Sequence, residues 1–419
     1  MKKIKLSFLL TVCMCMMGTK VSAQDLAVEN SQGKTIYYSY CSDGRELAVT
    51  RNKNGSGRTY SGDVIIPEEV TYMNRTRKVT AIDYLAFTNC LGLTSVTLPN
   101  SIKSIGIEAF ANCEKLTSFT IPDGVTSIGK FAFGGCSGLT AITIPGSMKS
   151  IGKEAFKGCT QLSTLIISDG VQSIGESAFS GLYKITNVTI PNSVTYLGDY
   201  AFASTGLTSV TIGNGATLLK STFDNCRRLT SVVIPNGVTT LRGTFYGCTN
   251  LTSITIPPSV TEIGVSSFWD CEKLTAVHIS DLAAWCKIKF GTNGSNRTSN
   301  PLIYAHHLYL NGEEIKDLVI PEGVTTISSI AFGWLTNLNS LTIPKSVTGF
   351  GGNVFIKSTI PTIYCNITNP TKIWGKTSDS AVFSLDTFNN ATLFVPAGMV
   401  GKYQAVDGWK DFIFIEEKK

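Results

Sequence analysis

This sequence of 419 residues is poor in charge and in histidine. Charged residues make up 16% of the chain, and there are three histidines, His278, His306 and His307. No Ser-His-Asp set, glycine-rich phosphate loop, HExxH or CxxC motif is recognisable. These arrangements activate a nucleophile, hold a phosphate or bind a metal. The sequence therefore predicts a protein that is not an enzyme and has no cofactor and no metal site.

A long apolar run is also missing from the body of the chain, so no transmembrane segment is expected. The first residues are different. Three lysines precede the apolar run at residues 6–17, which is followed by Val21, Ser22 and Ala23. A basic start, a short apolar core and small residues at the end are typical of a signal peptide. We expect residues 1–23 to be cleaved and the protein to be exported, to the cell surface, the extracellular space or the periplasm.

A concentrated basic stripe is the third feature that is lacking. The whole chain has 36 Lys and Arg against 30 Asp and Glu. Four lysines leave with the predicted signal peptide, so the mature chain keeps 32 basic and 30 acidic side chains, a net charge of +2. Nucleic-acid binding needs clustered positive charge, and we therefore exclude it.

An internal repeat dominates the rest of the sequence. Four stretches of 23 residues align without gaps, at residues 93–115, 116–138, 139–161 and 251–273. In the second of them the apolar positions are Leu116, Phe119, Ile121, Val125, Ile128, Phe133 and Cys136. Repeats of this length indicate stacked structural units that share one continuous core, because a single unit cannot bury its own apolar face.

Each repeat predicts the same local structure. A Leu-x-x-Val-x-Ile segment alternates apolar and polar residues, which is typical of a short strand. Proline then ends the strand, since it has no N–H group to donate. A Val-Thr-Ser-Ile segment predicts a second short extended piece. The Glu-Ala-Phe-x-x-Cys segment predicts one helical turn, with its Phe in the core.

A phenylalanine recurs once per repeat, as a core residue of a stacked structure should. We interpret this Phe ladder as packing and not as an aromatic binding strip. Its members are Phe87, Phe110, Phe133, Phe156, Phe179, Phe202, Phe223, Phe245, Phe268, Phe332 and Phe355.

The consensus LxxLxIPxxVxxIGxxAFxxCxx resembles the BspA-like leucine-rich repeats of bacterial surface proteins, over residues 63–357. Residues 391–412 are similar to the C-terminal ends of such proteins. The resemblance implies an α/β solenoid: a right-handed, curved superhelix with a parallel sheet on its concave face, short strands and helical turns elsewhere, and caps at both ends. It also implies a location at or outside the cell surface, and an adhesin-like role in binding other proteins, usually through the concave sheet.

Around the repeats the sequence predicts a definite organisation. Residues 24–62 form an N-terminal cap with strands at 35–40 and 46–50, and residues 63–357 contain about 11–12 turns, with a loop at 72–78. An insertion at residues 281–314 contains a short helix over 281–290 and a hairpin around Asn311 and Gly312, a strong tight-turn signal. In the insertion Glu313 and Glu314 are expected to be solvated. Residues 358–419 form a C-terminal cap with strands at 362–367 and 392–395 and a helix at 400–405.

Seven cysteines occupy one repeat position, three residues after the ladder Phe: Cys90, Cys113, Cys136, Cys159, Cys226, Cys248 and Cys271. An exported protein with ten cysteines after its signal peptide could be held together by disulfides. However, Leu182 and Thr205 take the same position in two other repeats, which leaves no pairing partner there. The pattern predicts reduced, buried cysteines, and a single stacked column does not surround a metal.

The strand positions that point outward carry mostly serine and threonine and almost no charge. One explanation is that threonine suits an exposed strand. The other is a flat, neutral docking surface, with the insertion beside it contributing rings. For Trp285 the alternative is that it only covers the flank of the solenoid. The histidine pair would point to opposite faces of a strand, which disfavours a shared metal. The candidate contact residues are Thr189, Thr211, Thr255, His278, Trp285, His306 and Tyr309.

Three functions are compatible with these features. The first is a secreted or cell-surface protein that binds a host protein or a protein of a neighbouring cell. The second is a glycan-binding component of nutrient capture, and the third is a structural part of a surface layer. A broad Ser/Thr sheet with few exposed rings would favour a protein partner, and aromatic platforms on one face would favour a glycan. Self-assembly in solution would favour the structural role.

Overall fold

The computed structural model describes residues 26–42, 44–52, 59–291 and 299–418, so the predicted signal peptide lies outside the described residues. The chain divides into two compact units, Met1–Leu207 and Thr208–Lys419. The division falls within the predicted repeats.

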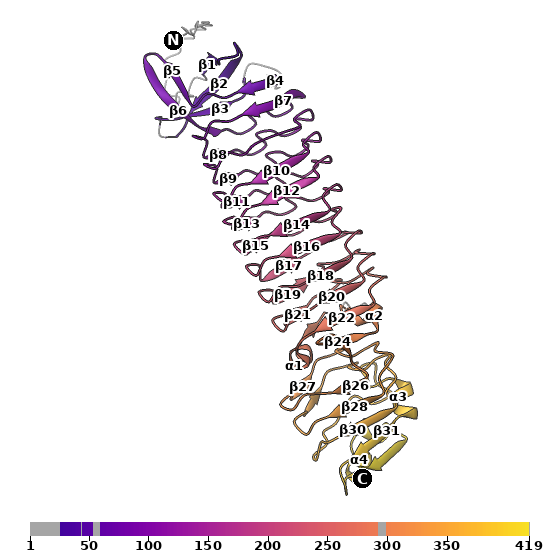
Figure 1. Ribbon diagram of the computed structural model, residues 1–419. Helices are drawn as coiled ribbons and strands as arrows, with labels where there is room; N and C mark the ends of the chain where they lie inside the picture. The colour runs from indigo at the N-terminus through magenta and orange to yellow at the C-terminus, as the bar shows by residue number, and fades with distance from the viewer. Residues whose placement is uncertain (1–25, 43, 53–58, 292–298, 419) are drawn as a thin grey trace, which may run out of the picture. The chain divides into compact units, whose positions relative to one another are not determined.

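In the first unit, most repeats contribute one short strand to each of two parallel ladders (Figure 1). The repeat at residues 116–138 is the exception, because before its proline it makes only a single bridge, from Ser118 to Ala141. The register joins equivalent residues of successive repeats, as in Ala141 with Thr164 and Ser150 with Ser173. The predicted strand before the proline and the predicted Val-Thr-Ser-Ile strand are therefore both confirmed. The strands before the proline make up what we call the first ladder, and the Val-Thr-Ser-Ile strands make up the second ladder. The strands of the first kind are β4 (Ser61–Ile65), β7 (Gly92–Thr97), β10 (Ala141–Ile144), β12 (Thr164–Ile167) and β14 (Asn187–Ile190). The second kind are β8 (Ser104–Ile105), β9 (Ser127–Ile128), β11 (Ser150–Ile151), β13 (Ser173–Ile174) and β15 (Tyr196–Leu197).

The N-terminal strands extend this second ladder. Strands β1 (Leu26–Glu29), β2 (Thr35–Tyr40) and β3 (Leu47–Thr50) form an antiparallel meander, and β3 then pairs in parallel with β6 (Arg75–Ile82). The predicted strands at 35–40 and 46–50 are confirmed. The loop predicted at 72–78 is wrong. Strand β5 (Glu69–Tyr72) pairs antiparallel with β6, and Met73 and Asn74 have φ angles of 49° and 60°, as a tight two-residue hairpin turn requires.

The segment with the ladder Phe is not the helical turn that the sequence predicts. Around Phe110, the N–H groups of Ala109, Ala111 and Cys113 donate to carbonyls three residues earlier. The N–H groups between them donate to the next repeat instead, as Phe110 does to the Ala132 carbonyl at 2.7 Å. In a helix, successive N–H groups all donate to carbonyls of the same segment. A row of turns that shares half of its donors with the next repeat forms in its place.

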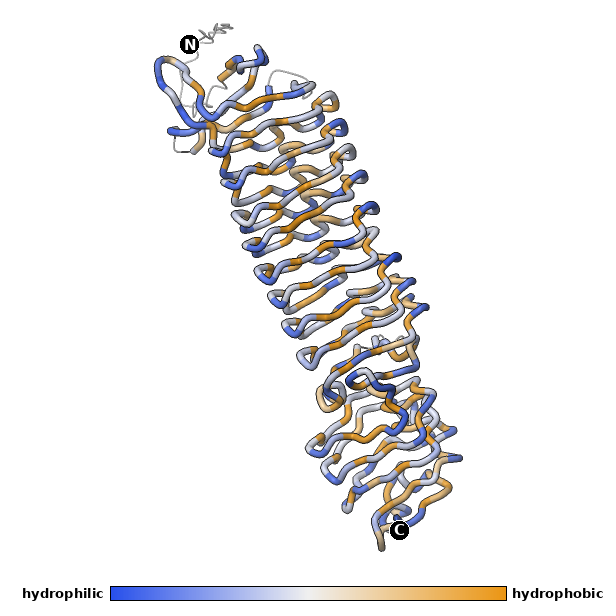
Figure 2. The backbone as a smooth tube through the Cα atoms, viewed as in Figure 1, coloured by the Kyte–Doolittle hydropathy of each residue, from blue (hydrophilic) through white to orange (hydrophobic). Residues whose placement is uncertain are grey.

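The Phe ladder lies in the core, as predicted. In the first unit the rings from Phe87 to Phe202 are at most 2% exposed, and successive centroids are 4.8–5.4 Å apart. Figure 2 shows hydrophobic and polar residues alternating along the turns. The ladder is longer than the sequence pattern indicates. Tyr60 contacts Phe87 at 4.6 Å, and in the second unit Phe383 stacks on Phe355 at 5.2 Å.

The second unit repeats the two-ladder arrangement. One ladder contains β16 (Ser209–Ile212), β18 (Ser231–Val233), β20 (Ser253–Thr255), β22 (Ala276–Ile279), β24 (Leu308–Leu310) and β25 (Glu313–Glu314). The other contains β17 (Leu218–Lys220), β19 (Thr240–Arg242), β21 (Glu262–Ile263) and β23 (Lys289–Phe290). After β25 two further sheets follow. They are β26 (Asp317–Val319), β28 (Ser340–Ile343), β30 (Thr362–Cys365), β31 (Thr392–Val395) and β32 (Phe414–Glu417), and the pair β27 (Thr326–Ile327) and β29 (Gly349–Phe350).

The insertion at residues 281–314 still contributes a strand to each ladder. Lys289 pairs with Glu262, and Tyr309 pairs with His278. The predicted helix over 281–290 is shorter than expected: α1 spans Leu282–Trp285, and its first turn is capped by Asp281, which accepts a hydrogen bond from the Ala284 N–H at 2.9 Å. A second helix, α2 (Leu302–Ala305), precedes the predicted hairpin, which is confirmed as β24 and β25.

The C-terminal residues lose the sequence period but keep the ladder. The strands predicted at 362–367 and 392–395 and the helix at 400–405 are present as β30, β31 and α4 (Val400–Ala405). Strand β32, which pairs with β31, is not among the predicted elements. Helix α3 (Leu385–Asn390) lies between β30 and β31 in the sequence, and the short 3-10 helix η1 (Trp409–Asp411) lies between α4 and β32. Handedness, curvature and the capping roles stay predictions.

Candidate interaction surface

Five of the seven predicted contact residues lie at outward positions of the first ladder: Thr189, Thr211, Thr255, His278 and Tyr309. Strands β10, β12 and β14 alternate exposed and buried residues, so Ile142 and Val188 point into the core and Thr189 points out. In the second unit Thr211 is exposed on β16 and Thr255 is half-buried on β20. The predicted outward positions of these threonines are confirmed. On this face β20, β22 and β24 are joined by parallel backbone pairing, which holds their outward side chains in place.

Some threonines near this face serve the stack itself. Thr230, Thr252 and Thr275 lie just before their strands, and each hydroxyl donates to the corresponding carbonyl of the preceding repeat at 3.0–3.2 Å. Their presence therefore has a structural reason.

A pair of rings stands on the outward face at β22 and β24. His278 stacks on Tyr309 with 4.9 Å between ring centroids, and both side chains are half-buried. Thr255 is in register with His278 on the adjacent strand. The fold therefore brings three of the predicted contact residues, Thr255, His278 and Tyr309, into one row across three strands.

The other two histidines do not lie on a strand. His306 ends α2 in a left-handed conformation, and its Nδ1 is 3.1 Å from the Trp334 carbonyl oxygen. His307 Nδ1 is 2.6 Å from Glu314 Oε1. The bond from His307 lowers the pKa of the Glu314 carboxyl. The expectation that Glu314 is merely solvated is wrong, because the hairpin turns this side chain back onto His307.

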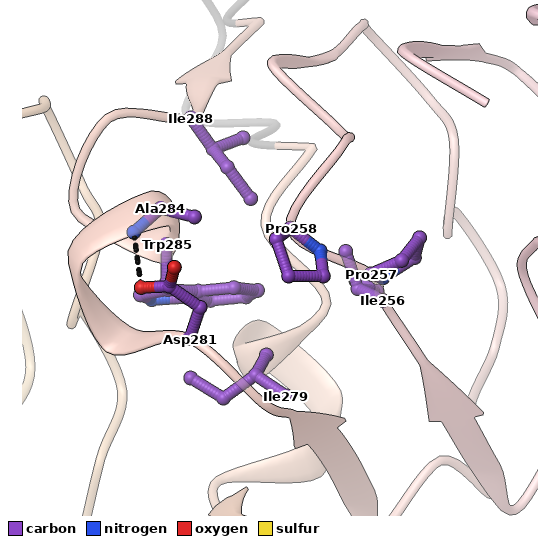
Figure 3. A pocket seen from close by; sticks show the side chains of 8 residues that line it. All are labelled: Ile256, Pro257, Pro258, Ile279, Asp281, Ala284, Trp285 and Ile288. Atoms are coloured by element: carbon purple, nitrogen blue, oxygen red, sulfur yellow. Dashed lines mark hydrogen bonds between the residues drawn. The ribbon is translucent and has the colours of Figure 1, made fainter. Parts of the chain in front are cut away.

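Trp285 is part of the core. It is 1% exposed, its Nε1 donates to the Ala331 carbonyl at 2.9 Å, and its ring meets Phe290 edge-on. Figure 3 shows the indole beside Asp281 and Ala284 and pointing toward Pro258. The indole fills the space between α1 and the preceding repeat, so Trp285 fixes the insertion in place. It is not exposed to a ligand.

The cysteine column is buried and hydrogen-bonded. Each of five thiols donates to the carbonyl of the ladder Phe one repeat earlier, at 3.1–3.3 Å: Cys113, Cys136, Cys159, Cys248 and Cys271. Ser358 makes the same bond to Phe332 at 2.8 Å. None of the ten described cysteines forms a disulfide, and burial raises the pKa of Cys159 and Cys271 to about 12. These thiols are therefore packing residues and poor nucleophiles.

Two of the cysteines outside the column are also buried. Cys365 accepts a hydrogen bond from the Tyr403 hydroxyl at 3.1 Å, and burial raises the pKa of Cys286 to about 12. Within the described residues, no three His, Cys, Asp or Glu side chains gather as they would around a metal ion. In the same part of the chain, no helix has the length and apolarity to cross a membrane.

Sequence reasoning missed two rings on the outward face. Tyr364 and Phe394 lie on β30 and β31 and stack with 5.4 Å between centroids. Their strands alternate as the earlier ones do, with Ile363 and Leu393 buried. Continuing the outward column past residue 357 would have found both rings.

The comparisons with known proteins agree with this architecture. The family model for the BspA type leucine rich repeat region matches six copies, over residues 80–205, 216–284 and 305–390. The chain belongs to this family. The matched BspA-type repeats include strands of both ladders, from β7 to β30. Among proteins with curated functions, none matches this chain.

Several solved structures are similar to these BspA-type repeats. A leucine-rich repeat protein from Bacteroides ovatus is 25% identical, with 79% of this chain and 93% of that chain covered and a TM-score of 0.43. The pneumococcal vaccine antigen PcpA is 18% identical, with 95% and 100% covered and a TM-score of 0.46. A leucine rich cell surface protein from Faecalibacterium prausnitzii is 23% identical, with 63% and 98% covered and a TM-score of 0.30.

Proposed function

We propose that this chain is an exported binding protein that holds a protein partner on the outward face of its first ladder. The family supports an interaction role, and the signal-peptide pattern at residues 1–23 supports export. The observation that carries the proposal is the row Thr255, His278 and Tyr309, in which hydroxyl and aromatic side chains lie in register on three bonded strands.

Such a row suits a protein partner for two physical reasons. Aromatic side chains are enriched in the central contacts of protein interfaces, where charged residues are depleted. The row is also held by a hydrogen-bonded ladder, so little conformational entropy is lost on binding. His306 precedes Tyr309 by three residues, and its ring is hydrogen-bonded to the Trp334 carbonyl. We propose that His306 helps to position the insertion.

The test starts with the mature chain, immobilised and exposed to an extract of host mucosal protein. Any captured protein is then purified and its affinity measured. The double variant Thr211→Glu with Thr255→Glu adds two charges to the outward face, and we expect it to weaken binding by at least about tenfold, since unpaired charges in an interface are costly.

A matched control adds the same charges elsewhere. Thr217 and Thr261 are exposed beside the second ladder and are also two repeats apart. Thr217→Glu with Thr261→Glu should bind as the wild type does. Both double variants must keep the wild-type circular dichroism spectrum. Full affinity of a folded Thr211→Glu, Thr255→Glu protein would rule out this face as the contact surface.

A further inference from the structure

The second unit has an aromatic pair that is separate from the row at Thr255. Tyr364 and Phe394 are in register on β30 and β31, and their ring planes differ by 16°. Both rings are half-buried on the outward face. The Lys418 ammonium lies 5.8 Å from the Tyr364 ring centroid. Neighbouring strands in a sheet are about 4.8 Å apart, so two rings in register on adjacent strands stack on one another.

The stack stops at Tyr364, because the next strand has no ring. Thr342 of β28 is in register with Tyr364, and Val319 of β26 is in register with Thr342. Val319 is 56% exposed. Strand β28 lies between β30 and β26, so the Tyr364 ring and the Val319 side chain are two strand spacings apart, about 10 Å. The side chain between them is that of Thr342, which is shorter than a ring. The outward face therefore steps down by one ring at Thr342, and we call this place the Thr342 step.

Hydroxyl groups surround the Thr342 step. Ser340 and Thr362 lie on the same face, two residues before Thr342 and Tyr364. The Ser340 hydroxyl donates to Asp317 Oδ1 at 2.6 Å. Asp317 is in register with Ser340, so its carboxylate lies beside the Thr342 step and disfavours an anionic ligand there.

We propose that the Thr342 step binds one pyranose ring of a neutral glycan. The C–H groups on the apolar side of a sugar carry a partial positive charge, and the face of an aromatic ring is negative. A sugar ring placed over Thr342 continues the stack on Tyr364 at the spacing of the strands. Its hydroxyls then meet those of Ser340 and Thr342, and the Asp317 carboxylate accepts from a sugar hydroxyl.

A glycan fits this place better than a protein does. A stable protein interface covers roughly 800 Å² on each partner, whereas the Thr342 step admits a single ring between two side chains. The proposal is independent of the protein-binding row, because its residues lie on β26, β28 and β30 and the row lies on β20, β22 and β24.

The experiment exposes the mature chain to a printed array of neutral and sialylated oligosaccharides, and then titrates the best neutral oligosaccharide by calorimetry. We expect binding to neutral members. Tyr364→Thr should weaken it about tenfold, the size of one aromatic contact, and Tyr364→Phe should retain it. Thr342→Phe should abolish binding, because the added ring fills the Thr342 step while Tyr364 stays in place.

Two controls make the outcome decisive. Trp374 is a ring that is 51% exposed on a segment outside the sheets, and Trp374→Ala should bind normally. The Thr211→Glu, Thr255→Glu variant should also bind the glycan, so this proposal and the protein-binding proposal can fail separately. The glycan proposal is overturned if no neutral oligosaccharide binds at millimolar concentration, if only sialylated members bind, or if folded Thr342→Phe binds as the wild type does.

Discussion

Truncating one ring of the Phe ladder tests the architecture most directly. Phe156 is fully buried, and its ring stacks between Phe133 at 5.2 Å and Phe179 at 5.4 Å. Phe156→Ala removes the apolar area of the ring, opens a cavity and breaks both stacks. Large-to-small changes of this kind cost about 3–5 kcal/mol. We expect the cost of Phe156→Ala to lie at the upper end of this range, because neighbouring turns that are hydrogen-bonded to each other cannot easily collapse into the cavity.

The effect on unfolding should also be local. In a stacked array, stability is the sum of the turns and the contacts between neighbours. A weak turn inside the first unit therefore lowers the melting temperature and splits the transition into two steps. Circular dichroism and calorimetry would follow both changes.

A matched control is Tyr183→Ala, because Tyr183 is 63% exposed and should be replaceable with little loss. An unchanged transition in Phe156→Ala would show that the ring does not support the core. The ladder and its register would then both be wrong.

Three further results are expected. A thiol reagent at pH 8 should leave most thiols of the native protein unmodified, because burial raises their pKa, and should find ten free thiols once the mature protein is denatured; a lower count after denaturation would reveal disulfides. Thr222→Ala should raise or preserve the melting temperature, since the buried Thr222 hydroxyl has no partner among the described residues, whereas Thr244→Ala should cost about 1 kcal/mol by removing the bond to the Leu219 carbonyl; equal losses would contradict this account. The lowered pKa of Glu314 means that its contribution to stability is present above the unfolded pKa, about 4.3, and is lost as the pH falls through the folded pKa. The difference in melting temperature between wild type and Glu314→Gln should therefore shrink from pH 7 to pH 3, and a constant difference would refute the role of the His307 bond.

The strands of the repeats could be predicted because their signal is local. Alternation and a following proline mark β10 and β12 within a few residues. The turn at Phe110 could not be predicted in the same way, because a helix and a row of turns share one apolar spacing. The decision depends on the Ala132 carbonyl of the next repeat, 22 residues away, which competes for the Phe110 N–H.

The candidate surface was predictable to a similar extent. The outward positions of Thr211, Thr255 and His278 follow from the period of two along a strand. The burial of Trp285 could not be predicted, because it depends on Ala331, 46 residues further on. Tyr364 could not be placed on the outward face, because the repeat period disappears before the ladder ends.

The bonding between repeats also has an evolutionary consequence. In the first unit Ser104, Ser127, Ser150 and Ser173 are successive partners in one ladder. Removing residues 127–149 would bring Ser150 to the place beside Ser104 that Ser127 occupies, with the backbone register of the ladder kept. A gene of this kind can therefore gain or lose one whole turn by unequal recombination while the register at the junction is kept. The length of such a protein is then free to vary among strains, while the chemistry of each turn is inherited unchanged.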